Sequence, residues 1–273
     1  MASKLAYRHR DINHVLSTGQ SLSVGAVGYP AISTKQPYAN MMFRTGVIAG
    51  GANLGTSFVP LVEGPNFANA AERDPPYLDD ETMSSGFASL VTKMSLDMTA
   101  TTPGMRRHDL LMSAHGIGGI AYVGLRKGSP LPAYANGMAQ VKAAFEIAVA
   151  MHKAYVVRAV TNVHGEADHV DGNVHYARDL LEWQATYEND IKALTGQTED
   201  VPMFHSQMSS WTFYGQGVSA IPEQQLSASL ASKGKLVLVG PKYNLQYSHD
   251  GVHLTNEGYR HMGEDYAKAY RAV

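Results

Sequence analysis

Residues 14–22 read His-Val-Leu-Ser-Thr-Gly-Gln-Ser-Leu, and the fold prediction starts from this stretch. The run His14–Ser17 predicts a short buried strand that ends near Gly19. Gly-Gln-Ser follows immediately, so Ser21 falls in the turn after the strand. Along the rest of the chain, strand signals alternate with glycine-containing loops and amphipathic helices. That alternation predicts a parallel sheet covered by helices on both faces.

Four further stretches carry strand signals, and β-branched residues mark the run Ala154–Val160 most clearly. The others are Asp109–Ala114, Val201–Ser206 and Lys235–Val239, and residues 46–49 give a weaker sixth signal. The chain is therefore expected to form an α/β protein, a three-layer α/β/α sandwich with about five parallel strands.

Helices are expected between these strands. Over residues 138–151, apolar side chains recur every three or four positions on one face. Residues 176–194 repeat that pattern, and Gly196 marks the expected end of the helix. A last helix is expected over residues 256–270, with Thr255 as its N-cap.

The length and composition are those of a folded protein. The chain has 273 residues, of which 44% are hydrophobic and 17% charged, and this excludes an intrinsically disordered chain. We expect a single domain over residues 1–273. Residues 50–86 hold four prolines and do not fit the alternation, so they are expected to form an insertion that covers the functional site.

Charge and cysteine content exclude several classes of function. The formal net charge of −2 gives no basic surface for nucleic acid or an anionic membrane. The chain has no transmembrane-length apolar run, and its polar N-terminus lacks the apolar core of a signal peptide. With no cysteine, disulfides, thiolate metal sites and a cysteine nucleophile are all excluded.

Four motifs lie where ligands bind in parallel sheets, beyond the carboxyl ends of strands. They are Gly19-Gln-Ser21, Gly118-Gly119, His164-Gly-Glu-Ala-Asp168 and Asp250-Gly-Val-His253. A serine nucleophile needs a base, and the base needs an orienting carboxylate, which an aspartate three residues before a histidine can supply. Glycine amides can supply hydrogen-bond donors to an oxyanion. The motifs therefore suit acyl transfer by a serine.

Together, these motifs resemble the SGNH hydrolase superfamily, which is related to the GDSL esterases. Within it, the chain is most similar to the carbohydrate acetylesterases that include sialate O-acetylesterases and acetylxylan esterases. Those proteins carry GQS, GG, QGE(S/A)D and DxxH blocks, and this chain has GQS at 19–21, GG at 118–119, HGEAD at 164–168 and DGVH at 250–253. The resemblance spans nearly the whole chain and implies a flavodoxin-like fold and esterase activity.

The resemblance also implies catalytic roles. Ser21 is the nucleophile, His253 is the general base and then the general acid, and Asp250 orients His253. The backbone N–H groups of Ser21 and Gly119 are the implied donors of the oxyanion hole, although the choice between Gly119 and its neighbour Gly118 stays open.

Two positions depart from the family pattern. His164 stands where the family has glutamine, and it is expected to replace that glutamine as a donor to the oxyanion. Ile120 stands where the family usually has serine or threonine. Gln20, Gly118 and Glu166 are expected to support the site, Glu166 by binding backbone N–H groups or by touching substrate.

A metal centre is an alternative use of the third motif. Six possible ligands crowd into twelve residues: His164, Glu166, Asp168, His169, Asp171 and His175. Their spacing is not HExxH, and no regular helix is predicted across residues 165–172. No metal ligand is therefore assigned, and no cofactor is expected.

The predicted activity is removal of O-acetyl groups from a carbohydrate through an acetyl-enzyme, and the expected partner is the acetylated carbohydrate. One alternative is a lipase or thioesterase of the same superfamily. Another is a glycan-binding module that keeps the fold without turnover. The residues do not decide the glycan or the oligomeric state, and both an extracellular setting and a phage particle fit the resemblance.

Overall fold

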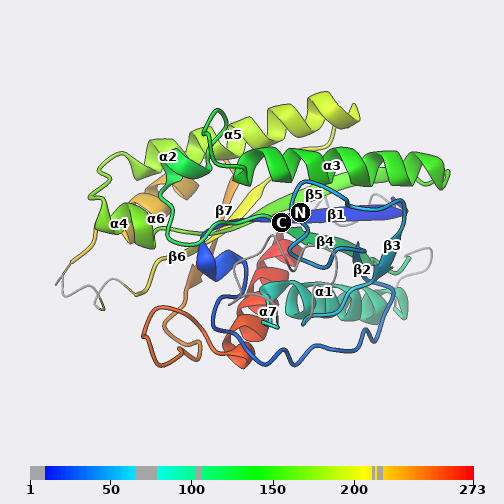
Figure 1. The fold of residues 1–273 in the computed structure, drawn as a ribbon, viewed down its shortest axis with the longest axis horizontal. Helices are drawn as coiled ribbons and strands as arrows, with labels where there is room; N and C mark the ends of the chain where they lie inside the picture. Colours follow the sequence, from blue (N-terminus) through cyan, green and yellow to red (C-terminus); the bar gives the residue numbers. More distant parts are fainter. Residues whose placement is uncertain (1–9, 65–78, 102–105, 211–212, 214–217) are drawn as a thin grey trace.

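The computed structural model describes residues 10–64, 79–101, 106–210, 213 and 218–273 (Figure 1). At its centre lies a seven-stranded sheet in the order β3-β2-β4-β1-β5-β6-β7. Within this sheet all neighbouring strands are parallel except β3, which runs antiparallel to β2. The strands are β1 Ile12–Gly19, β2 Met41–Phe43, β3 Phe58–Pro60, β4 Leu110–Ala114, β5 Tyr155–Val163, β6 Met203–Gln207 and β7 Leu236–Pro241.

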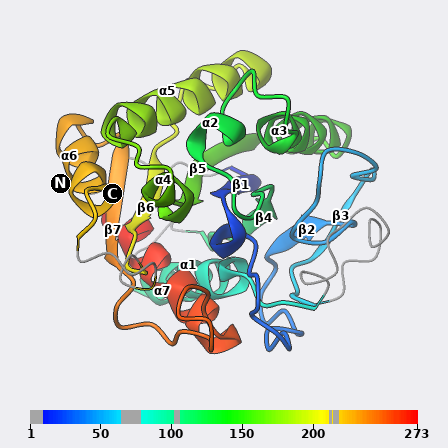
Figure 2. The same cartoon turned by 60° about the vertical axis from the view of Figure 1, so that its left-hand side comes forward.

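Helices cover both faces of the sheet and make three layers (Figures 1 and 2). One face carries α1 Met83–Thr99 and α7 Asn256–Ala272, and the other carries α2 Tyr122–Leu125, α3 Ala133–Ala150, α5 Tyr176–Thr195 and α6 Ile221–Ala231. Two short elements follow the carboxyl ends of strands: the 3-10 turn η1 Ser21–Ser23 after β1, and α4 Glu166–Val170 after β5.

The predicted three-layer α/β/α class and its five parallel strands are confirmed, as β1, β4, β5, β6 and β7. The sheet is larger than predicted. Residues 46–49 form no strand, because Ile48 makes only a single bridge to Ala114, and the sixth strand is β2. Strands β2 and β3 each have three residues, which is too short for an alternating pattern to identify.

The predicted helices correspond to α3, α5 and α7, and the Thr255 hydroxyl caps α7 by accepting from the N–H of Gly258 at 3.1 Å. Helices α1 and α6 are not predicted, because serine, glycine and proline weaken their helix signal. Residues 165–172 are also predicted to lack a helix, yet α4 forms there as little more than one turn.

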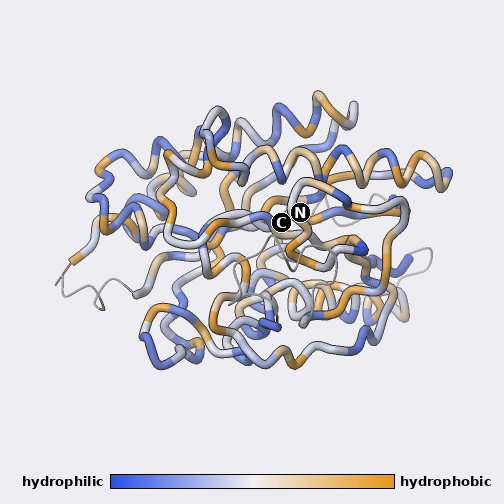
Figure 3. The backbone as a smooth tube through the Cα atoms, viewed as in Figure 1, coloured by the Kyte–Doolittle hydropathy of each residue, from blue (hydrophilic) through white to orange (hydrophobic). Residues whose placement is uncertain are grey.

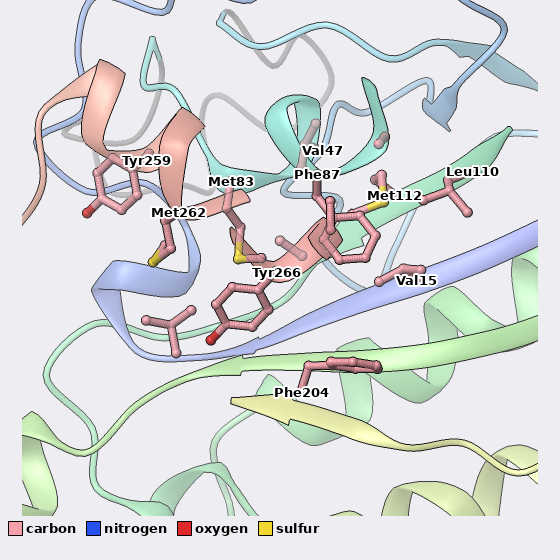
Figure 4. Packing of buried hydrophobic residues seen from close by; sticks show 14 of the residues in the cluster. Val15, Val47, Met83, Phe87, Leu110, Met112, Phe204, Tyr259, Met262 and Tyr266 are labelled. Carbon is pink, nitrogen blue, oxygen red and sulfur yellow. The ribbon is translucent and has the colours of Figure 1, made fainter. Parts of the chain in front are cut away.

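Apolar layers separate the sheet from the helices on each face. On one side, Phe87 of α1 and Tyr266 of α7 belong to the same buried cluster as Val15 of β1 and Met112 of β4 (Figure 4). Trp183 of α5 belongs to the cluster on the other side. In Figure 3 the outer helices alternate between hydrophobic and hydrophilic residues, as helices with one face on a sheet must.

Helices α1 and α7 approach each other through two glycines. A Cβ atom on Gly263 of α7 would lie 2.1 Å from the carbonyl oxygen of Met83, and one on Gly86 of α1 would lie 2.2 Å from that of Arg260. Both distances are far shorter than van der Waals contact, so the two backbones can meet only where a side chain is absent.

Two buried carboxyl groups hold the chain where it enters α1. Glu63 accepts hydrogen bonds from the N–H groups of Thr82 at 3.2 Å and Ser85 at 3.0 Å, and Glu81 accepts from the N–H of Ser33 at 2.8 Å. Burial, followed by the charge of Glu81, raises the pKa of Glu63 to about 8, although the hydrogen bonds from Ser85 and Thr82 oppose the rise. Glu63 is therefore mainly protonated at neutral pH.

The substitution Gly263→Ala should destabilise the protein by about 1–3 kcal/mol, because the new methyl group would force α1 and α7 apart. This loss should outweigh the gain of about 1 kcal/mol that alanine brings to a helix interior. Thermal and chemical denaturation would measure it. Arg271→Ala, at an exposed position on α7, is the control and should change stability by less than about 0.5 kcal/mol. An unchanged or more stable Gly263→Ala variant would contradict the close approach.

The substitution Glu63→Gln should flatten the pH dependence of stability. The folded pKa of about 8 lies above the ordinary value of 4.5, so the stability from Glu63 is complete below pH 4.5 and is lost as the pH rises through 8. The wild-type free energy of unfolding should fall relative to the variant's by at most about 1.4 kcal/mol per pH unit across this window. Chemical denaturation at several pH values tests this, with exposed Glu146→Gln as control. If the free energies of unfolding of wild type and Glu63→Gln changed with pH in the same way, the raised pKa of Glu63 would be contradicted.

Candidate active site

Ser21 lies at the carboxyl end of β1 with only 8% of its surface exposed. Gly19, which ends the strand, has φ of 125°, and a Cβ atom there would lie 2.3 Å from the carbonyl oxygen of Val163. Only glycine fits where β1 and β5 end side by side. The N–H of Gln20 donates to the same Val163 carbonyl at 3.2 Å, and the N–H of Ile117 donates to the Gly19 carbonyl at 3.1 Å. Hydrogen bonds to the end of β5 and to the loop after β4 therefore hold the turn that carries Ser21.

The loop before α7 brings His253 to Ser21. The Nε2 atom of His253 lies 2.7 Å from Ser21 Oγ, and its Nδ1 lies 2.6 Å from Asp250 Oδ2. The other oxygen of Asp250 accepts from the N–H groups of Val252 at 3.0 Å and His253 at 2.9 Å. The structure thus joins the three residues predicted from the first and last motifs in one hydrogen-bonded series.

Hydrogen bonding keeps Asp250 ionised. Partial burial raises the pKa of its carboxyl group, but hydrogen bonds from the His253 ring and from two backbone N–H groups outweigh that effect and lower the pKa overall. A carboxylate at Nδ1 holds the ring proton there and leaves Nε2 free to accept the proton of Ser21. This arrangement has the geometry that an activated serine nucleophile requires.

Helix α7 fixes the position of this loop. The Tyr259 hydroxyl donates to the carbonyl of Ala26, just after the turn of Ser21, at 2.7 Å. The Tyr266 hydroxyl donates to a carbonyl near the end of β5 at 2.8 Å. These bonds tie the helix that follows His253 to the segment just after Ser21 and to the end of β5.

Backbone amides suited to an oxyanion lie beside Ser21. The N–H groups of Ser21, Gly118 and Gly119 donate to no acceptor among the described residues, and all three residues line the same cavity. They are therefore available to a ligand oxygen.

A cavity of about 350 Å³ opens at Ser21, within the size range of small-molecule sites. Its lining contains the residues Gln20, Ser21, Gly118, Gly119, Glu166, Ala167, Val170, Asp171, Val252 and His253. The described residues of the segment 50–86 do not line it. The expectation that this insertion covers the site also involves residues 65–78, which lie outside the described ranges.

Two of the predicted supporting residues anchor α4 beside the cavity. The side-chain oxygen of Gln20 accepts from the N–H of Ala167 at 3.3 Å, which joins the turn of Ser21 to α4. Glu166 is 1% exposed and lies 3.5 Å from the Nζ of Lys242, which is equally buried and donates to the carbonyl of Gln207 at 3.0 Å. Lys242 is not among the predicted site residues, because a single lysine after a strand carries no sequence signal of burial.

His164 does not reach the cavity, and its predicted role as an oxyanion donor requires correction. Its ring lies behind the site, 1% exposed, with Nδ1 2.7 Å from the Tyr176 hydroxyl and Nε2 2.9 Å from the carbonyl oxygen of Ile120. Both ring nitrogens are occupied, so no N–H remains for a substrate. His164 instead holds the loop that contains Gly119, and Ile120 contributes its backbone to that contact.

Two of the possible metal ligands of the third motif, Asp168 and His164, are hydrogen-bonded to other groups of the protein. Asp168 accepts from the N–H of Tyr122 at 2.8 Å and from the side chain of Asn173 at 2.5 Å, while His164 binds Tyr176. Within the described ranges, no three His, Asp or Glu side chains are placed to hold a metal ion. Nor does any helix in this part of the chain have the length and apolar character needed to cross a membrane.

Comparison with solved structures shows the fold. A protein from Arabidopsis thaliana is similar with a TM-score of 0.60 and 17% identity, over 95% of this chain and 98% of that one. NanS gives 0.55 at 14% identity, over 96% of this chain and 97% of its own. A carbohydrate acetylesterase from Xanthomonas citri gives 0.54 at 14% identity, over 96% of this chain but 56% of that longer protein.

These structures confirm the three-layer α/β/α fold that the sequence predicted. At such identities the similarity concerns the fold alone. No protein-family model matches the sequence, and the comparison with curated proteins found no match.

A fluorophosphonate probe should attach covalently to Ser21, because the 2.7 Å contact with His253 Nε2 would activate that hydroxyl. Intact-mass measurement and peptide mapping would locate the adduct. Ser21→Ala should give none, and His253→Ala should slow labelling by about 10²-fold or more. Ser248→Ala is the matched control, since Ser248 Oγ also lies beside a histidine nitrogen, 3.2 Å from Nδ1 of the exposed His249. Labelling of Ser21→Ala at the wild-type rate would contradict the assignment.

Proposed function

We propose that the protein is a serine esterase that removes O-acetyl groups from a carbohydrate. The observation that carries the proposal is the hydrogen-bonded series from Asp250 through His253 to Ser21, which ends at the cavity. These three side chains supply the orienting charge, the base and the nucleophile, so the proposed reaction needs no cofactor.

In the first half of the proposed reaction, Ser21 Oγ attacks the carbonyl carbon of the acetyl ester while His253 Nε2 takes the serine proton. Negative charge develops on the carbonyl oxygen, and the N–H groups of Ser21 and Gly119 are the donors that would hold it. His253 then gives its proton to the sugar oxygen, which leaves as a hydroxyl. The acetyl group remains on Ser21.

In the second half, water attacks the acetyl carbon and His253 accepts the proton of that water. The intermediate collapses as His253 returns the proton to Ser21 Oγ, and acetic acid leaves and ionises to acetate in water. Asp250 stabilises the imidazolium form of His253 in both halves. The lowered pKa of Asp250 matters to the reaction because it keeps this carboxylate charged.

Two further observations support an acetyl ester of a carbohydrate. The cavity is small, which suits a short acyl group, and its lining includes Gln20, the glycine amides and two carboxylates, polar groups that can bind a hydroxyl-bearing alcohol. The sequence motifs resemble those of carbohydrate acetylesterases, and one solved structure with the same fold is such an enzyme.

Acetate release from p-nitrophenyl acetate and from acetylated xylan tests the proposal. Ser21→Ala should lose nearly all activity, leaving at most the roughly 10³–10⁴-fold acceleration over water that an oxyanion hole and binding provide. Asp250→Asn should lower kcat by about 10²–10⁴-fold, because the imidazole would lose its orienting charge. EDTA should leave the wild-type rate unchanged.

Other outcomes would favour the alternatives. Equal rates for wild type and Ser21→Ala would remove the serine from the mechanism, and inhibition by EDTA would point to a metal. Strong preference for long acyl chains would favour a lipase or thioesterase. Glycan binding without acetate release would favour a binding module.

A further inference from the structure

The charges around the cavity have one sign. Among the ten residues that line it, Glu166 and Asp171 carry carboxylates, and no lysine or arginine from the described ranges contributes. Asp250 adds a third carboxylate just behind His253. The electrostatic environment of the reacting serine therefore depends on how these three negative charges are balanced.

Two of the three carboxylates have internal partners. Glu166 lies 3.5 Å from the Nζ of Lys242, and both side chains are 1% exposed, so this pair is neutral as a unit and Lys242 is not free to meet a ligand. Asp250 is hydrogen-bonded to the ring of His253. Since His253 must be neutral to act as a base, the pair of Asp250 and His253 keeps one negative charge at the start of the reaction.

Asp171 is different because it is exposed at the end of α4 and its carboxylate pairs with no described residue. Neighbouring residues of the same turn, Ala167 and Val170, are apolar and also line the cavity. An entering substrate therefore passes an unneutralised carboxylate, with no cation in the described lining to offset it.

We propose that this site selects acetyl esters whose sugar carries no negative charge, and that Asp171 is the specificity-determining residue that disfavours sugar acids. The inference rests on the proposed esterase function and narrows its substrate class. A carboxylate on the sugar would approach both Asp171 and the pair of Asp250 and His253, and like charges in a partly enclosed site repel over a distance set by the ionic strength. A neutral sugar meets no such barrier.

Two substrates of nearly the same shape, one charged and one neutral, separate the effect of charge on the rate from the effect of shape. Methyl 2,3,4-tri-O-acetyl-glucuronoside carries a carboxylate at C6, and its C6 amide has nearly the same shape without the charge. Wild type should show kcat/KM for the amide about tenfold above that for the acid at low ionic strength, where the Debye length is about 30 Å. The ratio should shrink towards one at about 1 M salt, where that length is about 3 Å.

Asp171→Asn should raise kcat/KM for the acid severalfold, leave the value for the amide nearly unchanged, and weaken the salt dependence. Glu146→Gln is the control, because it removes the same charge from an exposed position near the far end of α3 and should alter neither value. Hydrolysis of p-nitrophenyl acetate by all three proteins confirms intact folding and chemistry.

The outcomes separate the two proposals. If the amide and p-nitrophenyl acetate are hydrolysed but the acid is hydrolysed equally fast, or if Asp171→Asn does not change the ratio, the charge selection is overturned and the esterase stands. If wild type hydrolyses none of the three esters, the esterase proposal fails and the inference fails with it.

Discussion

The 2.7 Å hydrogen bond between Ser21 Oγ and His253 Nε2 joins two loops that are 232 residues apart, and the placement of the main elements serves to maintain it. One loop ends β1, the central strand, and the other precedes α7, the helix that packs on α1 through Gly263. The Tyr259 hydroxyl then ties α7 back to the chain just after Ser21. The packing of α7 on α1 and the hydrogen bond of Tyr259 hold the two loops in place. A base and a nucleophile from opposite ends of the chain therefore meet within hydrogen-bond distance.

The buried polar groups around the site serve mainly to hold neighbouring backbone segments in place. Glu166 and Lys242 form a buried ion pair, and such a pair adds little net stability once desolvation is counted, so its main effect here is to fix α4 against the end of the sheet. His164 has a comparable role, since both its ring nitrogens are bound and it holds the loop of Gly119. Of the charged side chains that line the cavity, Asp171 is the one that stays exposed without a described partner, and so it is the one suited to act on the substrate.

Local patterns predicted the long elements and the order of the motifs. The five longer parallel strands, α3, α5 and the capped start of α7 follow from runs of apolar residues and from Thr255. Strands β2 and β3 escaped prediction because three residues carry no readable period, and α1 because glycine and serine are weak helix formers, although Gly86 is required there by the approach of α7. The place of His164 in its motif predicts an oxyanion donor, whereas the contact with Tyr176 sets the position of its ring, and motif spacing does not report that contact.

The α/β class, the strand-loop-helix order and the residue types able to carry acyl transfer can be predicted from the sequence, because periodicity, turn chemistry and side-chain chemistry are local properties. Which of those residues meet is seen only in the folded molecule. The tertiary structure placed Asp250, His253 and Ser21 in one hydrogen-bonded series, turned His164 away from the cavity, and buried Lys242 against Glu166. The physical reason is that contact and burial depend on packing between elements distant in sequence, which composition and spacing do not encode.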